Sequence, residues 1–65
     1  LSPFDLEKVQ DFIKESLALI VFVERYSLPW EMKKFITSQL SEIVDYANLI
    51  LKLHGCYPLK AINNP

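Results

Sequence analysis

His54 and Cys56 are the residues of this chain best suited to chemistry, and they lie two positions apart. An imidazole beside a thiol offers either two metal ligands or a base next to a nucleophile. Because they are the only histidine and the only cysteine, one chain has too few ligands for a metal site. Two chains could pool them, but nothing in the sequence requires this. We therefore predict a helix C-terminal His54, an idle Cys56 thiol and no cofactor.

Carboxylate pairs form the second candidate for chemistry. Asp11 with Glu15 and Glu42 with Asp45 have the spacing of general acid–base pairs, but such work needs a desolvated pocket. The helical pattern places both pairs on polar faces. No residue is therefore predicted to be catalytic, and the chain is not expected to be an enzyme in its own right. A fragment of a larger enzyme, completed by other residues, is an alternative.

Basic residues give only a weak signal for nucleic acid. Lys33 and Lys34 are adjacent, but the seven lysines and arginines are scattered and eight acidic residues offset them, for a net charge of −1. A nucleic-acid site would have a basic stripe on one face. A small helical bundle that binds RNA or DNA is therefore kept as an alternative that the charge disfavours.

The short length of the chain limits the stability that it can have alone. A 65-residue chain buries only about 60% of its unfolded surface and usually needs a disulfide, a metal or a partner. With one cysteine and 51% hydrophobic residues, association is the remaining route. The longest apolar run, residues 17–23, is far below the about 20 residues of a membrane span. We expect an intracellular, cytoplasmic protein without a signal peptide and without membrane insertion.

Prolines and one glycine divide the chain into two long segments and a tail. Pro3, Pro29 and Gly55 mark the ends of segments 3–26 and 29–54, with Ser2 and Ser27 as candidate N-caps. The first segment has an apolar stripe at intervals of three or four residues, formed by Leu6, Val9, Ile13, Leu17 and Ile20. This stripe widens into the all-apolar run of residues 17–23. A helix that is apolar all round must be buried all round, which one neighbouring helix cannot achieve.

The second segment has a regular heptad, which predicts the seam of a left-handed helix pair. Its residues are Ile36, Leu40, Ile43, Ala47, Ile50 and His54. The opposite, solvated face is predicted to hold Lys34, Ser38, Ser41, Glu42, Asp45, Asn48 and Lys52. The tail is too short for a further helix; we expect it to fold over the open end of the hairpin, with residues 63–65 frayed.

These patterns predict an all-α protein: an antiparallel two-helix hairpin over residues 1–55, a tail over 56–65, and dimerisation of two hairpins into a four-helix bundle. The expected function is that of a non-enzymatic interaction and oligomerisation module, a small regulator or assembly subunit, whose first partner is another copy of itself and whose second is another protein. The predicted interface residues are Leu17, Leu19, Ile20, Phe22, Val23, Tyr26, Trp30, Ile36, Leu40, Ile43, Ala47 and Ile50.

Overall fold

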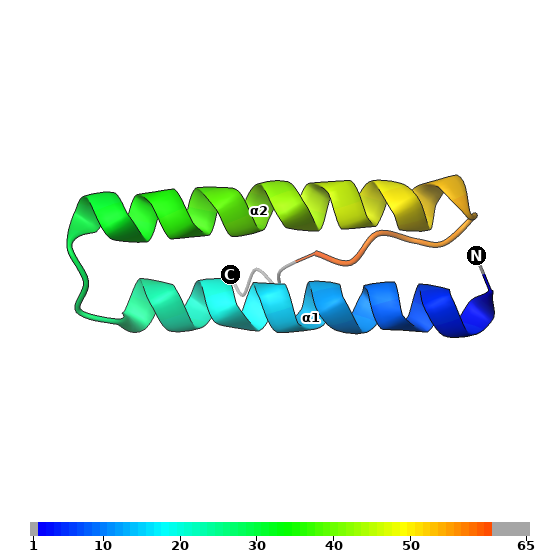
Figure 1. Ribbon diagram of the computed structural model, residues 1–65, viewed down its shortest axis with the longest axis horizontal. Coiled ribbons are helices and arrows are strands. Elements are labelled where there is room, and N and C mark those ends of the chain that lie inside the picture. The colour runs from blue at the N-terminus through cyan, green and yellow to red at the C-terminus, as the bar shows by residue number, and fades with distance from the viewer. Residues whose placement is uncertain (1, 61–65) are drawn as a thin grey trace.

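The computed structural model describes residues 2–60 and consists of two long antiparallel helices (Figure 1). Helix α1 spans Pro3–Arg25 and helix α2 spans Trp30–Leu53. The predicted all-α hairpin is confirmed, and the predicted segments 3–26 and 29–54 differ from the helices by one residue at three of the four ends.

A complete capping box starts α1. The backbone N–H of Asp5 donates to the Ser2 hydroxyl (3.2 Å), while the Asp5 carboxylate accepts from the Ser2 backbone N–H (3.2 Å) and hydroxyl (2.9 Å). These bonds satisfy N–H groups that the first turn of a helix leaves free. The hydrogen bonds from the Ser2 backbone and side chain hold the pKa of the Asp5 carboxyl below its ordinary value.

The turn between the helices corrects one prediction. Ser27 does not cap α2; Pro29 takes the N-cap position with φ −54°, and no side chain bonds there. The Pro29 carbonyl accepts the backbone N–H of Lys33 (3.0 Å), so the fixed φ of proline starts the helix without a polar cap. The Lys33 ammonium in turn donates to the Glu24 carbonyl (2.9 Å), which ties the end of α1 to the start of α2.

Helix α2 ends in a Schellman motif. Gly55 has φ +76°, its N–H donates to the Lys52 carbonyl (3.1 Å), and the Cys56 N–H donates to the Leu51 carbonyl (2.9 Å). This left-handed residue reverses the chain, so that the Cys56 side chain packs against the core. Glycine has a structural role here because other residues adopt this backbone conformation at a cost.

The core lies where the two helices meet, and it corrects the predicted seam of α2. Four buried residues form its centre: Ile13, Val44, Ala47 and Leu51. Ile43 and Ile50, placed in the predicted seam, are instead 42% and 39% exposed. Apolar residues occupy a wider part of the circumference of α2 than the predicted seam does. Within this part, the side that faces α1 is centred on Val44 and Leu51. Ser16 of α1 is also buried, which an apolar pattern could not indicate.

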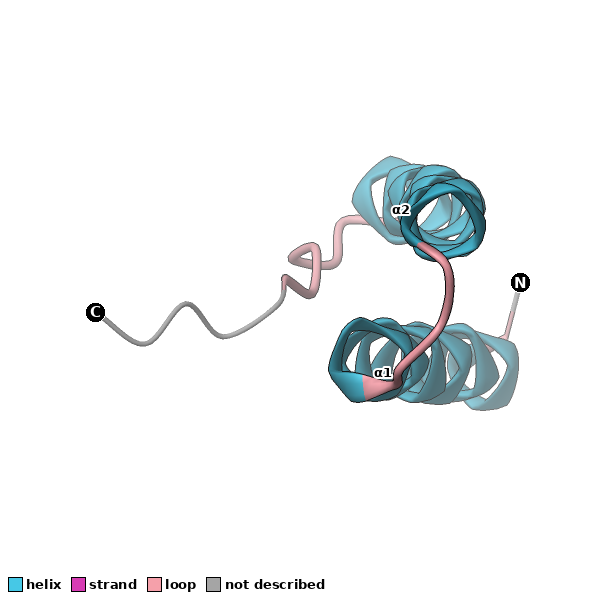
Figure 2. Cartoon of the chain, turned by 90° about the vertical axis from the view of Figure 1, so that its left-hand side faces the viewer, coloured by secondary structure: helices cyan, strands magenta, loops and turns pink. Residues whose placement is uncertain are grey.

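The chain beyond α2 runs back along one side of the helix pair (Figures 1 and 2). We call residues 56–60 the strap. It does more than close the open end, because Leu59 packs against the core and its backbone binds Asn48 in α2. Asn48 is therefore half-buried rather than part of the solvated face. The predicted fraying of residues 63–65 falls outside the described residues.

Candidate interaction surface

The strap makes the two broad faces of the hairpin different (Figure 2). On the strap face, Leu59 lies with Leu17, Ile20 and Val44 around a small pocket. On the opposite side, which we call the open face, no described segment crosses the helices. A shallow apolar groove runs there between α1 and α2, lined by Lys8, Val9, Phe12, Ile43, Tyr46, Ala47 and Ile50.

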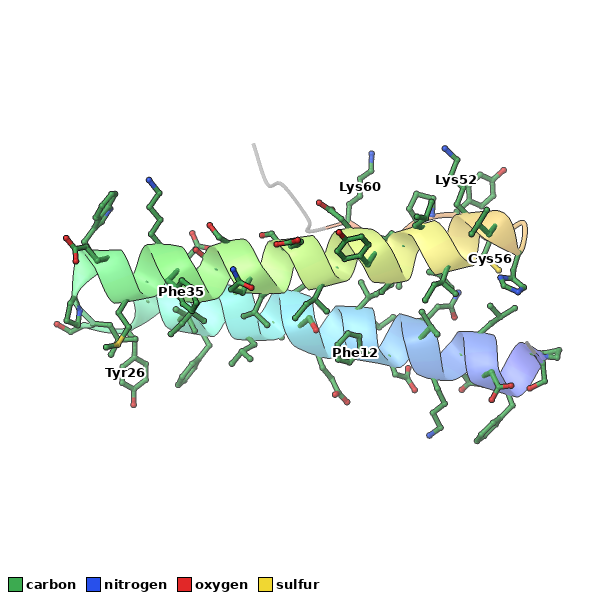
Figure 3. The ribbon with its side chains drawn as sticks, turned by 45° about the horizontal axis from the view of Figure 1, so that its top comes forward. Phe12, Tyr26, Phe35, Lys52, Cys56 and Lys60 are labelled. Carbon is green, nitrogen blue, oxygen red and sulfur yellow. The ribbon has the colours of Figure 1, made fainter. Side chains whose placement is uncertain are left out.

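The open face is apolar well beyond the groove. Phe12 is 47% exposed and Tyr46 is 63% exposed, and Phe35, earlier on α2, is 67% exposed. Figure 3 shows Phe12 and Phe35 on the side turned toward the viewer, away from the strap. In α1, Leu19 follows Phe12 by seven residues and so continues the same side of the helix, and Tyr26 lies just beyond the end of α1. Large exposed side chains therefore recur along the open face on both sides of the groove.

The predicted interface residues divide into three groups. Val23 and Ala47 are buried within the chain, while Leu17, Ile20, Ile36 and Leu40 are partly buried. The remaining six are exposed: Leu19, Phe22, Tyr26, Trp30, Ile43 and Ile50. The structure thus assigns part of the predicted set to the intrachain contact and leaves the rest available. Phe12 and Tyr46 are outside the predicted set, although each is a large side chain next to a predicted apolar position, Ile13 of the stripe and Ala47 of the seam.

Aromatic residues also gather at the turn end of the hairpin. The rings of Phe22 and Tyr26 lie 4.7 Å apart at an interplanar angle of 49°, an arrangement that favours aromatic contact. Trp30 is 69% exposed, and the Lys34 ammonium lies 4.9 Å from its ring centroid. This cation–π contact leaves one face of the indole beside a solvated charge.

The residues considered for chemistry lie at the other end. The Nδ1 atom of His54 is 2.9 Å from the Ile50 carbonyl oxygen, so the imidazole closes the last turn of α2. The Cys56 thiol, partly buried, donates weakly to the His54 carbonyl (3.9 Å). Over residues 2–60, no three histidine, cysteine or carboxylate side chains come together to hold a metal ion. Both His54 and Cys56 thus take part in hydrogen bonds with backbone carbonyls at the end of α2.

Neither of the two described helices has a stretch long and apolar enough to cross a membrane. No family model, curated protein or solved structure matches this chain.

Proposed function

We propose that this chain is a non-enzymatic interaction module that self-associates through its open face, two hairpins forming a four-helix assembly. Such an assembly would act as a small regulator or assembly subunit and could present its turn end to another protein. The proposal includes a reducing, cytoplasmic setting, where the single Cys56 thiol remains unpaired.

One observation carries the proposal: more large apolar side chains lie outside this fold than inside it. Among the described residues, fifteen large hydrophobic residues are exposed, against four larger hydrophobic residues and one alanine that are buried. Single exposed hydrophobic residues are ordinary, but a continuous apolar face marks an interaction site. Burial of one half-exposed aromatic side chain contributes about 1–1.5 kcal/mol, so several of them together favour association strongly.

Paired charge substitutions on α1 test the proposal. Leu19→Glu introduces a carboxylate on the open face, whereas Lys14→Glu introduces one on the strap side of the same helix, beside Cys56 and Leu6. We expect Leu19→Glu to shift the molar mass in light scattering from a multiple of the chain to the single chain, because it would bury an unpaired charge. Lys14→Glu should leave the assembly intact. Equal effects of the two substitutions would contradict the proposed face.

A further inference from the structure

The exposed side of α2 carries a second heptad that the intrachain core does not use. It contains Ile36, Gln39, Ile43, Tyr46 and Ile50, and it extends by one position at each end to Met32 and Leu53. The spacing alternates between four and three throughout, which is the pattern of a coiled-coil seam. All of its residues are exposed except Ile36, which is partly buried. We call this set the outer seam.

The outer seam lies at about a right angle to the core. Ile43, Tyr46 and Ile50 each precede a core residue by one position, since Val44, Ala47 and Leu51 are buried against α1. One position on an α-helix is a rotation of about 100°. In a four-helix bundle each helix contacts two neighbours at about this angle. Helix α2 therefore has the two contact sides of a bundle helix, and α1 fills only one of them.

The outer seam is also self-complementary in reverse. Seam positions are counted outward from Ile43 in both directions. The first positions are Gln39 and Tyr46, the second are Ile36 and Ile50, and the third are Met32 and Leu53, and each pair meets in an antiparallel copy. The two polar groups of the seam, the Gln39 carboxamide and the Tyr46 hydroxyl, thus meet each other when a second α2 runs antiparallel. In a two-fold dimer the same surface must match its own copy, and this seam does.

The open face has the area that a dimer needs. Four exposed aromatic residues of this face offer about 450 Å², since a whole aromatic side chain buries about 150–250 Å²; they are Phe12, Tyr26, Phe35 and Tyr46. Five aliphatic or thioether side chains, each 39% exposed or more, raise the total to roughly 700 Å²; they are Leu19, Met32, Ile43, Ile50 and Leu53. A standard interface buries about 800 Å² on each partner.

From these observations we infer that the occupant of the open face is a second copy of this chain, docked with its α2 antiparallel to the first α2 about a two-fold axis at Ile43. The inference rests on the proposed self-association and specifies its geometry. The strap covers the half of the opposite face that lies away from the turn, so the open face is the longer uncovered surface and the one we assign to docking. Gln39 meeting Tyr46 of the second copy sets the alignment, because any other alignment buries one of them against an apolar side chain.

Disulfide trapping tests this geometry in the full chain with Cys56→Ala as background. Ile43→Cys places two thiols at the two-fold axis, and Ser41→Cys places them on the exposed strap side of the same helix. We expect the Ile43→Cys chain to form a covalent dimer at least about ten times faster, because the dimer raises the effective thiol concentration. Circular dichroism of each reduced variant confirms that it is helical.

A second pair of cysteines tests the antiparallel direction. In that direction two Gln39 residues lie about 12 Å apart along the axis, eight residues at about 1.5 Å each, too far for a disulfide. An equal mixture of Gln39→Cys and Tyr46→Cys chains should therefore trap mostly the mixed dimer. Suppose that the wild-type chain is a dimer. If the Ser41→Cys chain then cross-links as fast as the Ile43→Cys chain, or if the equal mixture gives mainly the two unmixed dimers, the geometry is overturned and self-association still stands. A monomeric wild type would overturn both.

Discussion

The side-chain amide of Asn48 holds both backbone polar groups of Leu59. Its nitrogen donates to the Leu59 carbonyl (2.7 Å) and its oxygen accepts the Leu59 N–H (2.8 Å), as a neighbouring strand would. This pair fixes the strap eleven residues further along the chain and seats the Leu59 side chain on the core. These two bonds, together with the packing of Leu59, hold the strap on one face of the hairpin and make the two faces different.

Asn48→Ala should release the strap without unfolding the hairpin. Two partly buried hydrogen bonds are lost and the Leu59 polar groups return to water, so we expect a destabilisation of about 1–2 kcal/mol. Hydrogen exchange at the Leu59 N–H should accelerate far more than exchange in α2. Asp45→Ala, on an exposed side chain one turn earlier, is the matched control. Unchanged exchange at Leu59 in the Asn48 variant would show that packing alone holds the strap.

Much of this fold could be predicted from the sequence, because prolines, a serine cap and one glycine mark the helix ends directly. The side of α2 that faces α1 could not. Ile43 and Val44 are adjacent and similarly apolar, so periodicity alone cannot decide which of them enters the core. Asn48 was misplaced for a related reason: a carboxamide at a polar position gives no sign of a backbone partner eleven residues away. These errors concern tertiary contacts, which local patterns do not encode.

Gly55→Ala should weaken the end of α2. A Cβ at this position meets nothing within 4 Å, so the cost arises from the backbone at φ +76° and not from a clash. We expect a loss of about 1 kcal/mol in the free energy of unfolding, measured by urea denaturation at fixed protein concentration. Gly55→Asn should recover part of the loss, since asparagine tolerates this conformation better. A neutral alanine variant would mean that the Schellman turn forms without a left-handed residue.

The capping box of α1 should make the stability of the chain dependent on acid pH. The pKa of Asp5 is lowered by its bonds from Ser2, so the contribution of the carboxylate is complete above the unfolded pKa of about 3.9. It is lost as the pH falls through the lower folded pKa. The difference in thermal midpoint between wild type and Asp5→Asn should therefore be constant near neutral pH and shrink below about pH 4. A difference independent of pH would exclude the charged cap as its cause.

Gln39→Leu should remove the polar pair that sets the alignment and so loosen the specificity of the dimer. Leucine adds apolar burial, but this gain is offset by the Tyr46 hydroxyl left without a partner, so we expect a dissociation constant lower by about 5–30-fold only when Tyr46→Phe is added. The Tyr46 hydroxyl of the second copy then loses its partner, so Tyr46→Phe should cost less in this background than in the wild type. A double-mutant cycle by sedimentation measures the coupling. Zero coupling would contradict the pairing of Gln39 with Tyr46.

Sedimentation equilibrium of the unmodified chain over a range of micromolar concentrations tests the central claim most directly. We expect a species of twice the 7.6 kDa chain mass, with dissociation on dilution and a thermal midpoint that rises with concentration. A folded, cooperative monomer of 7.6 kDa at every concentration would contradict it, because the open face would then be stable in water without a second copy.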